Sequence, residues 1–221
     1  MHKGFPTHCS TLLSGPPGVG KFEFILSQIG GVLRGNERAV LVTLDTHPAE
    51  ANQRALSLGW DFGRYEAKSF LIVDCYSPTA EERPEPPPGK KRIVVSSFSN
   101  LEGIGMAIGK AAAELGTPAR IFVYTVSTLY LHNSNQAIAK FFQIVTSRVK
   151  TSMGFILYAV QEGVHETMTM NLLRSLVDGV IEMRFTESMS REVRMHHMRG
   201  LQVDPAWHPF TQLPGAYGGI G

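Results

Sequence analysis

An α/β fold is expected for this chain: a mostly parallel, doubly wound sheet flanked by helices, with an antiparallel strand pair near the C-terminus. Short apolar runs rich in branched residues alternate with longer amphipathic segments, as in parallel sheets with crossover helices. A glycine-rich turn at 14–22 joins the first run to the first helical segment. The chain has 221 residues, 43% of them hydrophobic, so residues 1–221 can form one domain with a sizeable core.

The first half of the chain is expected to supply three strands of this sheet and two of the helices that flank it. Runs of Val, Leu and Ile indicate buried strands. Pro48 suits a first helical turn and Gly59 a C-terminal stop, which together delimit the second helix. The expected strands are 9–13, 38–44 and 70–76, and the expected helices are 22–33 and 48–58.

Prolines interrupt the alternation at 77–91. Five prolines in this stretch exclude a central strand or a helix interior. A linker between two domains is one interpretation. The lengths of chain on either side favour the other, an exposed loop within one domain.

The second half continues the alternation and then changes character. Helical spacing of apolar residues over 134–152 and a run of small residues over 100–115 predict two helices. Two consecutive strand-like runs near the end, with no helix between them, predict the antiparallel pair. The tail at 206–221 is rich in Gly and Pro and is expected to loop over the surface. The expected strands are 93–96, 120–124, 154–160, 177–185 and 191–198.

Charge and cysteine content exclude several classes of protein. The formal net charge is +2, which gives no argument for nucleic-acid or membrane binding. Cys9 and Cys75 lie in apolar runs, and two cysteines make neither a disulfide framework nor a zinc pattern. No signal peptide and no apolar run of about 18 residues is present, so we expect a soluble cytoplasmic protein.

The segment 14–22 (SGPPGVGKF) resembles a phosphate-binding loop with one residue changed. The pattern is Gly, four residues, Gly-Lys and then Ser or Thr, and Gly15, Gly20 and Lys21 fit it. Backbone N–H groups of such a loop cradle phosphate, and the Lys adds charge. The residues expected to bind nucleotide are Gly15, Pro16, Pro17, Gly18, Val19, Gly20, Lys21 and Phe22.

Phe22 stands where the pattern has a hydroxyl that holds Mg²⁺. A phenyl ring offers no ligand to a metal. Two orientations of the ring are open from the sequence: it turns into the core, or it crowds the phosphate. The first leaves the cradle usable and the second blocks it.

Several further segments together resemble the KaiC-like branch of the RecA superfamily, over nearly the whole chain. The segment 42–48 (VTLDTHP) is similar to the family's "VTLEESP", and 197–200 (HMRG) to its "KMRG". Other matches are 162–165 (EGVH), 176–182 (LVDGVIE) and 207–210 (WHPF). The resemblance implies a RecA-like P-loop NTPase fold, ATP or ADP as ligand, and a homo-oligomeric ring with nucleotide at the subunit boundary.

The chain departs from this family at the positions that bind the metal ion and polarise the attacking water. Asp45 and Thr46 occupy the positions of two acidic residues that polarise the attacking water, and Tyr124 replaces the Asp of the second metal motif. Arg199 remains in the segment that reaches a neighbour's nucleotide. The resemblance makes Asp45 and Arg199 the candidate catalytic residues; no residue is assigned to a metal, and Mg²⁺ binding is in doubt. Asp45 acts as a general base or only caps the helix at Pro48.

These features predict an ATP- or ADP-binding module, regulatory or scaffolding, in which hydrolysis is impaired or absent. One alternative is a weakly active ATPase with a rearranged metal site. Another is a protein-interaction module without nucleotide, in which Phe22 plugs the loop. His165 senses the γ-phosphate or orients its loop. The protein partner is not predicted by the sequence.

Overall fold

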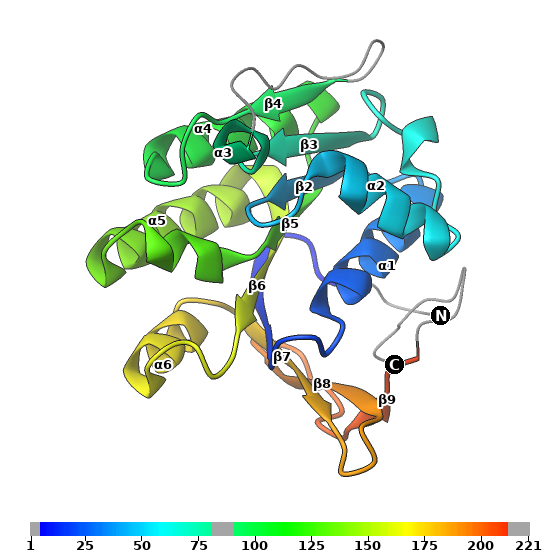
Figure 1. Ribbon diagram of the computed structural model, residues 1–221, viewed down its shortest axis with the longest axis vertical. Helices are drawn as coiled ribbons and strands as arrows, with labels where there is room; N and C mark the ends of the chain where they lie inside the picture. The colour runs from blue at the N-terminus through cyan, green and yellow to red at the C-terminus, as the bar shows by residue number, and fades with distance from the viewer. Residues whose placement is uncertain (1–4, 81–90, 212–221) are drawn as a thin grey trace.

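A computed structural model describes residues 5–80 and 91–211 (Figure 1). The strands are β1 (Cys9–Gly15), β2 (Ala39–Thr43), β3 (Phe70–Asp74), β4 (Arg92–Val94), β5 (Ala119–Tyr124), β6 (Gly154–Gln161), β7 (Gly179–Phe185), β8 (Arg191–Met198) and β9 (His208–Pro209). The α-helices are α1 (Lys21–Arg34), α2 (Pro48–Ser57), α3 (Ser77–Ala80), α4 (Leu101–Leu115), α5 (Asn135–Arg148) and α6 (Thr167–Ser175). Short 3₁₀ turns are η1 (Phe62–Arg64) and η2 (Val126–Leu131), and a π-helical turn, η3 (Val149–Met153), follows α5.

The strands form one nine-stranded sheet in the order β4-β3-β2-β5-β6-β1-β7-β8-β9. Strands β1 to β7 pair in parallel, and β8 and β9 pair antiparallel at one edge. The expected fold class is confirmed, including the C-terminal antiparallel pair. Because β1 lies between β6 and β7, the glycine-rich turn after it emerges from the interior of the sheet.

Each face of the sheet packs against its own helices, as Figure 1 shows, with α1 and α2 on one side and α4, α5 and α6 on the other. Neighbouring residues of a strand point to opposite faces. Leu12 accordingly packs with the α4–α6 helices and Leu13 with α1 and α2. Both are fully buried, so β1 is fixed from two sides.

Local signals fix the starts of the helices. Asn100 Oδ1 accepts from the N–H of Gly103 at 2.8 Å and caps α4. Ser134 Oγ accepts from the N–H of Ala137 at 3.3 Å and caps α5. These side chains occupy the N-cap positions that favour Asn and Ser.

Three parts of the structure differ from the sequence-based expectation. The helix α6 was not expected, because its short polar sequence hides an apolar face of Met170 and Leu173. The segment expected as a proline-rich exposed loop, 77–91, begins with the short helix α3, and its residues 81–90 lie outside the described part. Both corrections concern segments too short to show a clear period.

The tail is the third correction. Instead of a loop throughout 206–221, it forms β9 against β8, with His208 opposite Val193. Phe210 is buried, and its ring lies 5.9 Å from that of Phe24 on α1. Burial of this aromatic ring explains why a Gly- and Pro-rich tail is held to the sheet. Residues 212–221 lie outside the described part.

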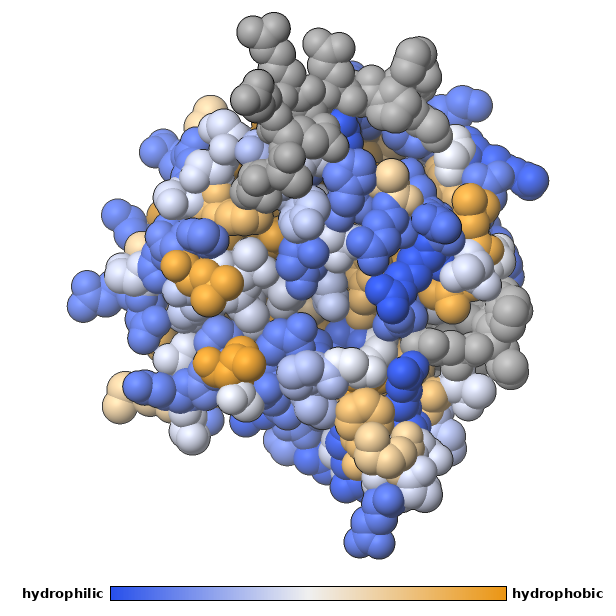
Figure 2. All heavy atoms as spheres, viewed as in Figure 1, coloured by the Kyte–Doolittle hydropathy of each residue, from blue (hydrophilic) through white to orange (hydrophobic). Residues whose placement is uncertain are grey.

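The surface shows no sign of a membrane segment within the described ranges: none of their helices is both long enough and apolar enough to cross a bilayer. The face seen in Figure 2 is largely polar, with separate apolar side chains rather than one large patch. Two highly exposed apolar residues are Leu131 and Met168, each 80% exposed. Isolated exposed apolar residues are ordinary for globular proteins.

Candidate functional site

The glycine-rich turn at 16–20 joins β1 to α1 at the carboxyl edge of the sheet. In Figure 1 the blue connection leads from the centre of the sheet into α1. Ligands of open α/β sheets bind in the crevice outside the carboxyl ends of the strands. The turn therefore lies where this architecture presents a ligand.

Three glycines permit the backbone of this turn. Gly18 and Gly20 have φ of 77° and 102°, in the left-handed region that favours glycine. A Cβ on Gly15 would lie 2.7 Å from the carbonyl oxygen of Met183 on β7. Gly20 is the N-cap of α1 and, within the described chain, no side chain caps that terminus. The first N–H groups of α1 are thus available to an anion.

Lys21 is folded back onto this turn. Its Nζ donates to the carbonyl oxygens of Gly15 and Pro16, both at 2.8 Å, and to Oε1 of Gln161 at 2.7 Å. An ammonium has three N–H donors, so these contacts engage all of them. Burial lowers the pKa of Lys21 to about 8, and nearby carboxylates, Glu162 foremost, oppose the shift.

Gln161 connects Lys21 to the next loop of the sheet edge. Its backbone N–H donates to Ser127 Oγ at 2.9 Å, and that hydroxyl pairs with His165 Nε2 at 2.8 Å. The Tyr130 ring lies 4.6 Å from the His165 ring, and burial lowers the pKa of His165. These contacts suit a histidine that orients its loop. Sequence reasoning missed Gln161 and Ser127; the only signal was that Gln161 ends β6, which pairs with β1, and that Ser127 follows β5, which pairs with β6.

Phe22 and Tyr124 pack against each other beside the turn. Their ring centroids are 4.5 Å apart, with 30° between the ring planes. Phe22 is 3% exposed and belongs to the core shared by α1 and α2. Of the two orientations open from the sequence, the ring adopts the one directed into the core. The two substitutions are therefore one feature, an aromatic pair.

The aromatic pair does not fit a magnesium ion. Mg²⁺ takes oxygen ligands in near-ideal octahedral geometry, commonly carboxylates and phosphates. Phe22 has no oxygen, and burial, reinforced by Asp45 and Glu23, raises the pKa of the Tyr124 phenol, which stays neutral at physiological pH. Within the described residues no three His, Cys, Asp or Glu side chains converge as a metal site. Phe22 and Tyr124 themselves are therefore suited to packing and not to holding a cation.

Asp45 follows β2 at the same sheet edge and reaches solvent. Protein atoms on most sides desolvate its carboxylate, which raises its pKa to about 6, although the Thr46 hydroxyl donates to it at 3.0 Å and opposes the shift. Asp45 does not cap α2. The cap is His47, whose Nδ1 accepts from the N–H of Ala49 at 3.1 Å. The capping alternative for Asp45 is therefore wrong.

Arg199 lies at the opposite edge of the sheet from the turn. Its Nη1 is 3.1 Å from Asp178 Oδ1, just before β7 begins. Burial disfavours ionisation of Asp178, but bonds from Lys150 and Ser10 outweigh it and lower its pKa. Since the amino and carboxyl edges are separated by the length of β1, Arg199 is not brought together with the phosphate loop of its own chain.

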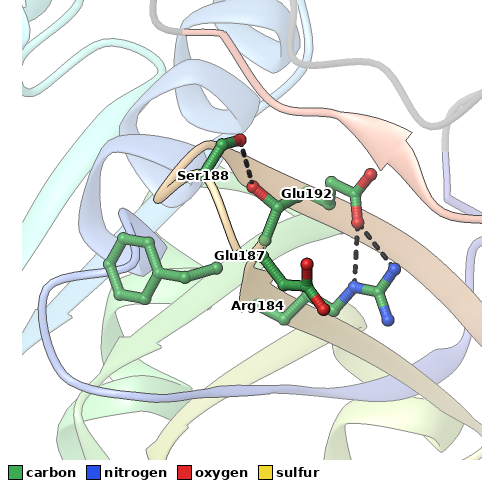
Figure 3. Close-up of a pocket in the computed structure, with 6 residues that line it drawn as sticks. Arg184, Glu187, Ser188 and Glu192 are labelled. Atoms are coloured by element: carbon green, nitrogen blue, oxygen red, sulfur yellow. Dashed lines mark hydrogen bonds and ion pairs between the residues drawn. The ribbon is translucent and has the colours of Figure 1, made fainter.

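A hollow at the tip of the β7–β8 hairpin lies at the same edge as the turn (Figure 3). Figure 3 shows Arg184 and Glu192 turned toward one another, with Nε and Oε2 at 2.8 Å. Trp207 lies beside this ion pair, 4.1 Å from the Arg184 guanidinium. Arg184 and Glu192 neutralise each other and Glu187 adds a negative charge, so the hollow supplies no positive charge for an anion at the loop. The hollow is lined by Arg184, Phe185, Thr186, Glu187, Ser188 and Glu192.

Comparison with known proteins identifies relatives over almost the whole chain. A sequence model of the family described as "ATPase: KaiC" matches residues 1–215. A UPF0273 protein of Aeropyrum pernix is 28% identical over 216 residues, covering 95% of this chain and 84% of that protein. A UPF0273 protein of Thermotoga maritima is 27% identical over 216 residues, covering 95% and 86%.

Among solved structures, the KaiC-like protein PH0186 of Pyrococcus horikoshii OT3 superposes with a TM-score of 0.71 at 17% identity. The match covers 96% of this chain and 89% of that one. At this identity the likeness concerns the fold alone. The sequence match to the family covers the loop, the aromatic pair and both candidate catalytic residues.

Proposed function

The chain belongs to the KaiC-type ATPase family, and from this premise we propose that it binds ATP or ADP as a regulatory or scaffolding module with weak or absent hydrolysis. One observation carries the proposal: the contact between Phe22 and Tyr124 at 4.5 Å. This contact fills the positions where the family pattern has metal ligands, while the backbone N–H groups of the turn beside it remain open.

The cradle supports nucleotide binding. The uncapped N-terminus of α1 and the left-handed Gly18 and Gly20 present backbone N–H groups as a phosphate-binding turn does. On binding, Lys21 exchanges its carbonyl and Gln161 partners for phosphate oxygens. Because a charged donor prefers a charged acceptor, this exchange favours the bound state.

The residues at the positions of the family's metal ligands support weak or absent hydrolysis. Phosphoryl transfer depends almost wholly on positioning and on neutralising charge in the transition state. Removing one stabilising donor from such a site costs about 10²–10³ in rate. Here the metal hydroxyl, the metal carboxylate and one acidic residue are replaced by Phe22, Tyr124 and Thr46, so charge stabilisation is reduced at several points.

A second candidate, a slow ATPase, is favoured by Asp45 and Arg199. With a pKa of about 6, Asp45 is ionised at neutral pH and able to accept a proton from water. Arg199 is 69% exposed at the amino edge, where it is available to a neighbouring copy in a ring. Light scattering with and without ATP tests that assembly.

The third candidate, an interaction module with no nucleotide, requires Phe22 to plug the loop. Burial of Phe22 among core residues of α1 and α2 argues against a plug. The three candidates make different predictions for one set of measurements.

Thermal unfolding with ATP, ADP or sulfate, combined with a phosphate-release assay, tests the proposal. A ligand at about 100 times its Kd stabilises the folded state by roughly 2.7 kcal/mol. We expect both nucleotides to stabilise the protein and phosphate release to stay at background. Lys21→Ala should abolish the stabilisation, whereas Lys110→Ala, an exposed lysine on α4, should retain it.

If neither nucleotide changes the unfolding temperature, the interaction module without nucleotide is the remaining candidate. Phosphate release that disappears in Lys21→Ala would instead establish the slow ATPase.

A further inference from the structure

We propose that the guanidinium of Arg54 takes the place of the metal ion in this site. It pairs with the phosphates that a metal would otherwise bridge, so nucleotide binding needs no divalent cation. The inference rests on the proposed function, because it concerns how the same loop neutralises its ligand. It starts from the misfit between the aromatic pair and Mg²⁺.

Arg54 lies over the ring that replaces the metal-binding hydroxyl. It belongs to the last turn of α2, and its guanidinium carbon is 5.9 Å from the centroid of Phe22. A guanidinium above an aromatic face is attracted by the ring quadrupole, and Arg makes this contact more often than Lys. The Phe22 ring thus places a fixed positive charge beside the position that the motif gives to a metal.

Two glutamates hold Arg54 in this position. Nη2 lies 3.0 Å from Glu23 Oε1 on α1, and Nη1 lies 3.7 Å from Glu50 Oε1, one turn earlier on α2. The Arg54 side chain is 48% exposed and the Glu23 side chain 14% exposed. The guanidinium has five N–H donors in a planar fork suited to bidentate phosphate binding, so an approaching phosphate can use donors on its open side.

The charges around the aromatic pair make such a donor necessary. Glu23, Glu50 and Asp45 all lie close enough to Tyr124 to raise its pKa. Against these carboxylates stand Lys21 and Arg54. A nucleotide adds further negative charge to this region, and like charges brought together are unfavourable. Lys21 supplies one charge, and the longer of the two Arg54 contacts, 3.7 Å to Glu50, is the one that a phosphate oxygen can replace.

The competing interpretation is that Arg54 only joins α1 to α2 through Glu23. Exposed ion pairs of this kind contribute little to stability. That interpretation predicts that nucleotide affinity is independent of Arg54. The two can be separated by binding measurements on folded variants.

Calorimetric titration of ATP and ADP in EDTA tests the proposal with the variants Arg54→Gln and Arg64→Gln. Arg64 is the matched control, because it is 80% exposed and pairs with Asp61 at 2.8 Å in η1. We expect Arg54→Gln to weaken ATP binding at least about tenfold, the scale of a charged hydrogen bond. ADP binding should weaken less, and Arg64→Gln should match the wild type.

A Glu23→Gln variant gives an independent readout if Arg54→Gln loses stability. Releasing Arg54 from Glu23 should tighten ATP binding a few-fold, which a purely structural ion pair would not do. Wild-type affinity for ATP in both Arg54→Gln and Glu23→Gln would overturn the role of Arg54. A wild-type protein that binds neither nucleotide would instead refute the proposed function.

Discussion

The two sides of the glycine-rich loop differ in which of the family's features they keep. On one side, Gly15, Gly18 and Gly20 give the turn the left-handed φ angles and close backbone approach that the proposed phosphate cradle needs. On the other, Phe22 and Tyr124 form a buried aromatic contact in place of metal ligands. The first side is made of main-chain N–H groups and the second of side chains.

Under the proposed function, this difference would let nucleotide binding and hydrolysis separate within one site. A main-chain cradle depends on the path of β1 and α1, which the core fixes, so substitutions of neighbouring side chains that keep this path leave its N–H groups in place. A metal site depends on a few oxygen atoms, and each can be lost by one substitution. In this chain Phe22 and Tyr124 form an apolar contact at these positions, which under the proposed function contributes to packing rather than to catalysis.

The largest expected effect concerns the cradle. A Cβ on Gly15 would meet the backbone of Met183 at 2.7 Å, so Gly15→Ala forces β1 and β7 apart. We expect nucleotide affinity to fall by about 100-fold or more and unfolding free energy to fall by about 2 kcal/mol, as overpacking does. Gly18→Ala is the matched control: no atom lies within 4 Å of its Cβ, so its strain comes only from φ of 77°.

Calorimetry and denaturant unfolding compare the two variants. Gly18→Ala should lose about 1 kcal/mol of stability and less affinity than Gly15→Ala. Equal affinities in the two variants would show that the backbone of Gly15 is not part of the binding side.

The next effect concerns the aromatic pair. Phe22→Ala removes a buried ring and should lower the unfolding free energy by about 3 kcal/mol. A double-mutant cycle with Tyr124→Ala should give a coupling of about 1 kcal/mol, as for other aromatic pairs. Nucleotide affinity should change only a few-fold in either single variant. A large loss of affinity with little loss of stability would mean that the rings take part in nucleotide binding. That result would contradict the division into a binding side and a packing side.

A pH effect arises from Lys21. Burial places its pKa near 8, below the ordinary value of 10.5, so the free protein loses this charge as the pH rises through 8. Phosphate favours the charged form, and affinity should therefore fall by up to about tenfold per pH unit above 8. Titrations at pH 7, 8 and 9 measure the slope. A flat profile would show that Lys21 contributes no charge to the cradle.

The smallest expected effect concerns Asp45. Its pKa of about 6 lies above the ordinary 3.8, so ionisation disfavours the folded state at pH 7. Asp45→Asn should raise the unfolding free energy at pH 7 by about 1 kcal/mol after allowance for solvent screening, because the side chain is exposed. The gain should vanish below pH 3.8, where both states are protonated. Thermal unfolding at pH 7 and pH 3.5 tests the sign, and an equal gain at both would contradict it.

The sequence predicted the fold class and the position of the glycine-rich turn because both depend on local patterns. Alternating apolar runs indicated the parallel sheet, and the spacing of Gly15, Gly20 and Lys21 indicated the loop. The helix α6 and the strand β9 escaped prediction because their stability comes from packing against distant elements rather than from their own periodicity.

The remainder of the site depends on contacts between distant segments. Phe22 and Tyr124 were each recognised as unusual, but their contact joins α1 to the end of β5 and has no local signature. Gln161 contacts Lys21 from β6, Arg54 lies over the Phe22 ring from α2, and neither residue belongs to a motif. Only the folded arrangement shows that the two unusual residues, Phe22 and Tyr124, pack against each other.

The most direct test of the account is the Kd of ADP and of ATP measured by calorimetry in excess Mg²⁺ and again in EDTA. The account predicts saturable binding in both conditions, with each Kd changing by no more than about threefold, since Phe22 and Tyr124 offer no ligand to the cation. Binding that occurs only with Mg²⁺ would contradict it. So would the absence of binding in either condition.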